Sequence, residues 1–134
     1  MENQIMIIEP NFFEMKKAVK SCEDHGFPAF VAESIKWAKP ALQQSIFFSA
    51  IVISLNSSYL TLLEICLDLN IPCLLVYEEK SKKDLQKIIR YIGVIKNAKN
   101  YYQKNIPILS KDEGWEKIIS KATELIDIKI KTRN

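Results

Sequence analysis

The stretch from Ile46 to Asn56 reads Ile-Phe-Phe-Ser-Ala-Ile-Val-Ile-Ser-Leu-Asn and is apolar almost throughout. Because both alternating sets of side chains are apolar, the stretch predicts a strand that is buried on both faces, as in a parallel sheet covered by helices. In open α/β sheets, ligands and reactive groups lie at the carboxyl ends of such strands. Ser54 lies at that end here, so it is the first candidate site residue.

Shorter apolar runs and amphipathic segments alternate along the rest of the chain. Strands are expected at 4–9, 27–32 and 71–77, and helices at 11–26, 34–44, 59–69, 85–93 and 111–126. Pro28 is compatible with the second strand only at the edge of the sheet. The segment 94–103 is ambiguous, because 94–95 could continue the fourth helix whereas 99–103 is typical of a short fifth strand. Alternation of this kind predicts right-handed crossovers and a parallel sheet flanked by helices.

The first expected helix has a suitable residue at each end. Asn11 is a favourable N-cap, and Gly26 is a favourable stop. Between them, apolar residues recur at helical spacing, which predicts an amphipathic helix with a stripe made of Phe12, Met15, Val19 and Cys22.

Composition restricts the class of protein. With 134 residues, of which 48% are hydrophobic and 26% charged, the chain predicts one soluble domain over 1–134, with its core at 4–127 and a frayed lysine-rich tail. No apolar run is long enough to span a bilayer, so we expect no membrane partner and a cytoplasmic location. The three cysteines lack C-x-x-C spacing and are expected to be buried in a reducing compartment. A net charge of +3 from dispersed lysines argues against nucleic acid as a partner.

Glycine and histidine are too scarce for several kinds of site. The three glycines are far apart, which excludes a glycine-rich dinucleotide motif and a P-loop. A single histidine, His25, argues against a histidine-based metal centre.

Four expected strand ends carry polar or aromatic residues in a recognisable order. They are Glu9-Pro10, Ser54-Leu55-Asn56, Tyr77-Glu78 and Tyr101-Tyr102-Gln103-Lys104. This order resembles the acidic pair, phosphoacceptor aspartate, hydroxyl residue and lysine of the receiver (CheY-like) domains of bacterial two-component response regulators. The resemblance implies a flavodoxin-like (CheY-like) α/β fold, in which βα is repeated five times and a five-stranded parallel sheet has helices on both faces.

The same comparison implies a lost phosphorylation site. Phosphoryl transfer to a receiver needs a carboxylate nucleophile, Mg²⁺ held by acidic side chains, a hydroxyl donor and a lysine. Ser54 replaces the aspartate, Pro10 replaces one acid and Tyr77 replaces the hydroxyl residue. We therefore expect no catalytic residue, no metal, weak or absent Mg²⁺ binding, and a degenerate pocket made of Glu9, Pro10, Ser54, Asn56, Tyr77 and Lys104.

Two side chains of this expected pocket have alternative placements. Lys104 either pairs with Glu9 across the pocket or reaches solvent. Tyr77 either fills the volume that phosphate and metal would occupy or is an exposed aromatic residue at the end of a strand.

Two functional hypotheses follow, from different classes of protein. The first is a phosphorylation-independent receiver that signals through a protein partner, including a second copy of the chain. Its contact surface would be the face of the fourth helix, fifth strand and fifth helix, with the candidate residues Lys87, Tyr91, Lys96, Tyr101 and Tyr102. The second is an N-glycosidic-bond enzyme similar to nucleoside deoxyribosyltransferases and their TIR-like relatives, with Glu64 as its catalytic acid. A scaffolding or DNA-binding protein on the same fold is a third, weaker hypothesis, since fold does not fix function.

Overall fold

The computed structural model describes residues 4–43, 48–55, 59–99 and 106–133. The five strands are β1 (Gln4–Ile8), β2 (Ala29–Ala32), β3 (Phe48–Ser54), β4 (Cys73–Tyr77) and β5 (Ile108–Ser110). They form one parallel sheet in the order β2-β1-β3-β4-β5. This is the predicted flavodoxin-like (CheY-like) fold, with the second strand at an edge as expected.

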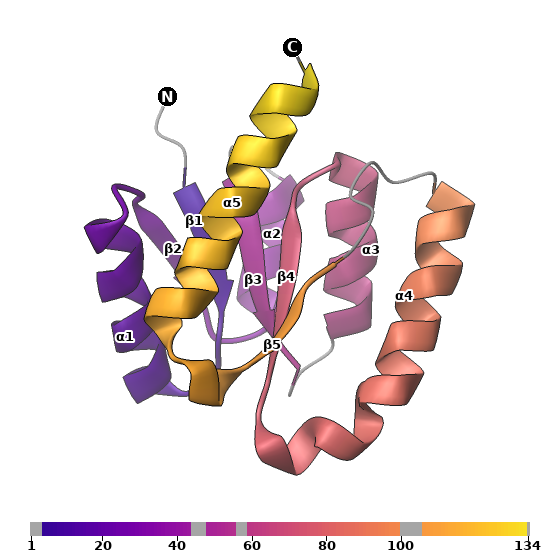
Figure 1. Ribbon diagram of the computed structural model, residues 1–134, viewed down its shortest axis with the longest axis horizontal. Coiled ribbons are helices and arrows are strands. Elements are labelled where there is room, and N and C mark those ends of the chain that lie inside the picture. The colour runs from indigo at the N-terminus through magenta and orange to yellow at the C-terminus, as the bar shows by residue number, and fades with distance from the viewer. Residues whose placement is uncertain (1–3, 44–47, 56–58, 100–105, 134) are drawn as a thin grey trace.

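Within these ranges, five α-helices connect or follow the strands: α1 (Phe12–Asp24), α2 (Ile35–Gln43), α3 (Tyr59–Leu69), α4 (Leu85–Lys99) and α5 (Trp115–Arg133). Two short 3₁₀ turns, η1 (Glu79–Asp84) and η2 (Lys111–Glu113), precede α4 and α5. Figure 1 shows α1 and α5 on one face of the sheet and α2, α3 and α4 on the other. The chain therefore forms three layers, with the sheet in the middle.

β3 lies at the centre of both hydrophobic cores. It pairs with β1 on one side and with β4 on the other, and its apolar residues are buried. Ile51 and Ile53 belong to the core beneath α2, α3 and α4, whereas Ala50 and Val52 belong to the core beneath α1 and α5. The run that is apolar on both faces thus fills two cores at once, as its sequence indicates.

Residues with a left-handed backbone end two of the helices as predicted. Asn70 has φ +60° and follows α3, and Gly26 has φ +81° and follows α1. After each helix, one amide reaches back five residues, from Ile71 to Cys66 and from Phe27 to Cys22, which is the hydrogen bond of a Schellman motif.

The fifth strand is the main difference from the sequence prediction. Lys99 is the last residue of α4, and the strand that pairs with β4 is Ile108–Ser110, in register with Leu75 through Tyr77. The prediction of a strand at 99–103 is therefore wrong at Lys99, and 100–103 lie outside the described residues. α4 continues past the exposed Gly93 to Lys99, beyond the expected helix end at residue 93.

The last and the first α-helix also differ from expectation. α5 runs to Arg133, beyond the predicted end at residue 126. In α1, the buried residues are Ala18, Ser21 and Cys22, whereas Phe12 is largely exposed. Most of the predicted apolar stripe of α1 therefore lies outside the core.

No helix in the described ranges is long and apolar enough to cross a membrane.

Candidate functional site

The carboxyl ends of β1 and β3 bring Glu9 and Ser54 together. Glu9 follows β1 and is fully buried, and Ser54 is the last residue of β3. The Ser54 hydroxyl donates a 2.8 Å hydrogen bond to Glu9 Oε1. Glu9 Oε2 accepts a 3.0 Å hydrogen bond from the backbone amide of Asn11 at the start of α1. A buried carboxylate at this edge is thus held by a hydroxyl from a neighbouring strand and an amide from its own loop.

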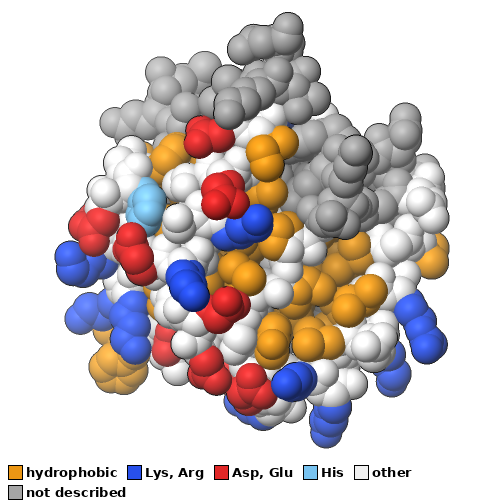
Figure 2. Space-filling view, viewed as in Figure 1, with side chains coloured by type: hydrophobic (Ala, Val, Ile, Leu, Met, Phe, Trp, Pro, Cys, Tyr) orange, Lys and Arg blue, Asp and Glu red, His pale blue; other side chains and the backbone are white. Residues whose placement is uncertain are grey.

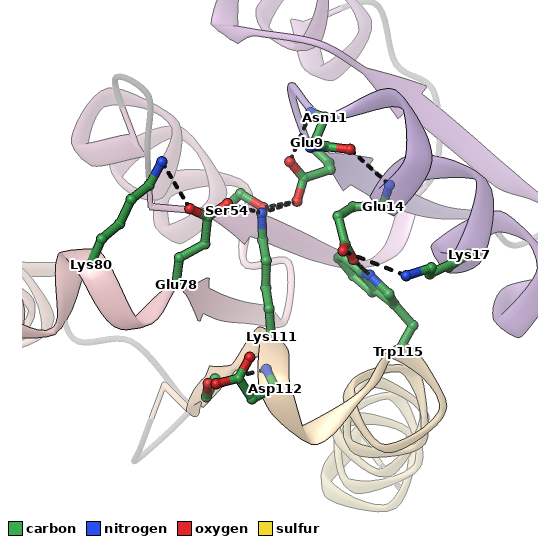
Figure 3. Close-up of polar contacts among 11 residues, drawn as sticks. Glu9, Asn11, Glu14, Lys17, Ser54, Glu78, Lys80, Lys111, Asp112 and Trp115 are labelled. Atoms are coloured by element: carbon green, nitrogen blue, oxygen red, sulfur yellow. Dashed lines mark hydrogen bonds and ion pairs between the residues drawn. The ribbon is translucent and has the colours of Figure 1, made fainter.

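Lys111 supplies the positive charge that this buried carboxylate needs. It follows β5 directly, and its side chain is only 8% exposed. Lys111 Nζ lies 2.5 Å from Glu9 Oε1 and 3.1 Å from Glu78 Oε1, so one ammonium group joins two carboxylates (Figure 3). A buried charge is tolerated only when it is paired and hydrogen-bonded, a condition that Glu9 and Lys111 satisfy for each other.

Local capping places Lys111 in this position. The Ser110 hydroxyl accepts a hydrogen bond from the Asp112 amide, and Glu113 accepts one from the Ser110 amide, which together form a capping box around η2. The strand therefore stops at Ser110, and Lys111 begins the turn with its side chain directed into the site (Figure 3).

Glu78 closes the cluster toward solvent. It follows β4 and contacts Lys80 Nζ at 3.1 Å as well as Lys111. Hydrogen bonds from Lys80 and then Lys111 lower the pKa of Glu78, which keeps this carboxylate ionised. Two carboxylates thus meet two ammonium groups at the carboxyl edge of the sheet.

Pro10 and Tyr77, two further residues of the predicted pocket, are among the described residues. Pro10 is exposed. Tyr77 is half-buried against the core beneath α2, α3 and α4, because side chains alternate along β4 and Tyr77 shares a face with Leu75. The residue from this strand end that enters the site is Glu78. Asn56 lies outside the described residues.

The lysine at the end of the fifth strand is Lys111 and not Lys104. The prediction of Lys104 rested on a fifth strand at 99–103, whereas Lys99 is helical and the strand that pairs with β4 begins at Ile108. Lys104 itself lies outside the described residues. Sequence reasoning missed Lys111, although the apolar run 106–110 followed by the capping-box pattern Ser110-Lys111-Asp112-Glu113 could have identified it.

The residues predicted for the interaction surface are only partly described. Lys87 is exposed on α4 and Tyr91 is half-buried on the same helix. Tyr101, Tyr102 and the side chain of Lys96 lie outside the described residues.

Glu64, the catalytic candidate of the enzyme hypothesis, is hydrogen-bonded to a tyrosine side chain. The Tyr91 hydroxyl donates a 2.6 Å hydrogen bond to Glu64 Oε1, which raises the pKa of Tyr91. This contact joins α3 to α4. The structure gives the glycosidic-bond hypothesis no support.

Within the described ranges, no group of three or more His, Cys, Asp or Glu residues is arranged to hold a metal ion. The three cysteines are buried, as predicted, and form no disulfide with one another.

Similarity to known proteins is confined to structure. No protein-family model matches the sequence, and no curated protein matches it. A CheY-like receiver domain protein from Methanospirillum hungatei matches with a TM-score of 0.73 at 13% identity, over 98% of this chain and 99% of that one. The fold is that of receiver domains.

Two further solved structures agree with this likeness. A response regulator from Thermotoga maritima has a TM-score of 0.71 at 11% identity, over 95% of this chain and 99% of that one. A receiver protein from Pseudomonas putida has a TM-score of 0.67 at 11% identity, over 95% and 97% of the two chains. At sequence identities this low, the structural similarity establishes a common fold only, and function has to be argued from the site.

Proposed function

We propose that this chain is a signalling protein with a receiver-like fold that works without phosphorylation, by binding a protein partner. The observation that carries the proposal is the position of Lys111 Nζ, between the carboxylates of Glu9 and Glu78. In a phosphorylated receiver, a lysine at this strand end would neutralise the phosphoryl group. Here its contacts are with side chains of the chain itself.

β3 ends in a serine and not in a carboxylate. An aspartyl phosphate requires a carboxylate nucleophile, and β3 ends in Ser54, whose hydroxyl donates to Glu9. A serine hydroxyl becomes a good nucleophile when a nearby base takes its proton. Glu9 is a poor candidate for that base, because its carboxylate already contacts Lys111 and the Asn11 amide.

The carboxylates present do not fit a magnesium site of the receiver kind. Mg²⁺ needs oxygen ligands in near-octahedral geometry, usually with one or two free carboxylates. Glu9 and Glu78 are the acids that meet in this cluster, and both contact the Lys111 ammonium group. A bound Mg²⁺ would have to displace that ammonium from a fully buried carboxylate.

Signalling in this proposal depends on the surface formed by α4 and β5. Figure 2 shows hydrophobic side chains gathered between these two elements. Ile89 and Val94 of α4 are 50% and 68% exposed, and Ile108 of β5 is half-buried. Exposed apolar patches of this kind mark protein interaction sites. A second copy of the chain is the first partner to test.

The test is sedimentation of the purified chain over a range of concentrations, with and without acetyl phosphate and Mg²⁺. We expect self-association that these reagents leave unchanged and that Ile89→Asp with Val94→Asp abolishes. Phe12→Asp with Phe13→Asp, two exposed apolar positions on α1, is the matched control and should self-associate normally. Association that appears only with acetyl phosphate would contradict the proposal, and a chain that stays monomeric throughout would exclude a second copy as the partner.

A further inference from the structure

β2 forms one edge of the sheet, and half of its backbone groups turn away from the other strands. The Glu9 amide donates a 3.0 Å hydrogen bond to the Ala32 carbonyl at the end of β2. Backbone groups alternate between the two sides of a strand, so Ala29 and Val31 direct their N–H and C=O groups away from β1. Among the described residues, no strand lies beyond them (Figure 1). β2 therefore presents donors and acceptors that an added strand can use.

The features that shield edge strands in most proteins are charged side chains, proline and local hydrogen bonds. β5, at the opposite edge, has such a bond, because the Ser110 amide donates to the Glu113 carboxylate at 3.3 Å. β2 reads Ala-Phe-Val-Ala and carries no charge, and its Val31 side chain is 39% exposed. Pro28 precedes the strand, but its carbonyl faces β1, where it accepts from the Ile5 amide at 3.0 Å. The outer side of β2 is therefore the less protected of the two edges.

The outer flank of α1 forms an apolar wall beside this edge. α1 packs over β1 and β2, and α5 lies next to it over β3 and β4. Ser21 faces α5, because its hydroxyl donates to the Trp115 carbonyl at 3.2 Å. With roughly 100° of rotation per residue, Met15 and Val19 lie on the flank opposite Ser21, toward the edge of the sheet. Both are half-buried and line a shallow groove of about 660 Å³.

A single extended segment fits this place better than a second folded copy of the chain. β2 has four residues and is roughly 13 Å long, so pairing two such edges buries far less than the roughly 1,200 Å² of a specific interface between folded proteins. A lone strand can lie along the edge and place every second side chain against Val31, Met15 and Val19. Apolar β-branched side chains suit these neighbours, because they pack well on a pleated surface.

We propose that the outer edge of β2 binds an extended segment of a partner protein, with β-branched apolar residues at alternate positions, as an added strand. The backbone groups of Ala29 and Val31 hold the segment, and the groove beside α1 selects its side chains. β2 and β5 lie at opposite edges of the sheet, so this surface is separate from the one formed by α4 and β5.

The test is binding of a fluorescein-labelled peptide of alternating valine and threonine, with a lysine at each end, to the full chain. We expect a saturable rise in fluorescence anisotropy at micromolar to millimolar concentrations of the chain. In hydrogen exchange followed by NMR, the peptide should slow exchange of the Ala29 and Val31 amides about tenfold or more. The amides of Phe30 and Ala32, which already face β1, should change little.

Variants of the chain separate the backbone contact from the side-chain contact. Val31→Pro removes an outward N–H and should abolish binding, whereas an edge strand tolerates proline at such a position, so the circular dichroism spectrum should be unchanged. Val31→Thr keeps the N–H and the shape of the side chain and should bind normally. Val19→Ser should weaken binding about tenfold by removing part of the apolar wall. Val94→Ser, the matched change on α4, should have no effect.

Two N-methylated peptides test strand pairing without altering the chain. One row of peptide amides faces β2 and the other faces away. Methylation of the valine amides and methylation of the threonine amides should therefore differ, with one peptide binding and the other not.

Three results would overturn the inference. They are no binding of the peptide to the wild-type chain, equal binding by Val31→Pro, and equal binding of the two methylated peptides. Protection of the Ala29 and Val31 amides that rises with the concentration of the chain alone would instead assign the edge to a second copy. None of these outcomes depends on phosphorylation or on the α4 surface, so this inference and the proposed function can fail separately.

Discussion

At the scale of single residues, the Glu9–Lys111 pair is the contact on which the site depends. Glu9→Gln keeps the size of the side chain and removes its charge, so Lys111 loses its closer, buried carboxylate. Removing one member of a buried ion pair costs about 3 kcal/mol, and we expect this loss in the free energy of unfolding measured with urea. Lys17→Gln removes an exposed pair with Glu14 at 3.7 Å and should cost under about 1 kcal/mol. Equal losses from the two variants would contradict a buried, stabilising pair.

The pKa of Glu78 gives a second prediction at this scale. Hydrogen bonds from Lys80 and Lys111 lower it, so the stabilisation is present above the pKa of the unfolded chain and is lost as pH falls through the lowered value. Lys80→Gln should raise the pKa of Glu78 toward its ordinary value, as followed by NMR titration of the side-chain carboxyl carbon. A Glu78 pKa that is unchanged in Lys80→Gln would show that Lys80 has no part in the shift.

Prediction from sequence failed for some of these residues for definable reasons. Ser54 and Glu9 were found because they follow apolar strands that are easily recognised. Lys111 was missed because β5 has only three residues, and Tyr101-Tyr102 has the higher strand propensity. Which of Tyr77 and Glu78 enters the site depends on the register of β4, and strand register is a tertiary property.

At the scale of elements, the end of α3 depends on one left-handed residue. Asn70 has φ +60°, a conformation that costs a residue with a Cβ about 1 kcal/mol unless it is Asn or Asp. Asn70→Ala should therefore lower the free energy of unfolding by about 1 kcal/mol, whereas Asn70→Gly should leave it nearly unchanged. Thermal unfolding of the two variants side by side checks this, and equal losses would show that the backbone conformation is not the cause.

The order of the strands and helices was predictable because hydrophobic residues recur at a clear strand or helix spacing in most of these elements. The alternation of strands and helices predicted the parallel sheet, and Gly26 marked the end of α1. The orientation of α1 was not predictable from its stripe. Packing against α5 turns Ser21 inward, where its hydroxyl donates to the Trp115 carbonyl, and leaves Phe12 outside.

At the scale of the whole molecule, the two cores enclose all three thiols. Burial raises the pKa of Cys22 to about 12, and a hydrogen bond with Cys73 together with burial raises that of Cys66. Ellman's reagent should therefore leave the native thiols unmodified near neutral pH and should modify three per chain after unfolding in urea. Rapid modification of the native chain would contradict this packing.

The raised pKa of Cys22 also gives the sign of a pH effect. The unfolded chain releases this proton at a lower pH than the native chain does, so stability from the neutral thiol is complete below the unfolded pKa. It should decline from about pH 9 to about 12, and urea unfolding at rising pH checks this decline. In Cys22→Ala, this part of the decline should be absent.

The central claim, that a lysine and two carboxylates of the chain itself occupy the place of phosphate and metal, is tested most directly by phosphorylation. The measurement is the intact mass of the chain after incubation with acetyl phosphate and Mg²⁺, with a receiver domain that retains its aspartate treated in parallel. We predict that the control gains one phosphoryl group and that this chain gains none. A stoichiometric, acid-labile phosphoryl group on this chain would contradict the account.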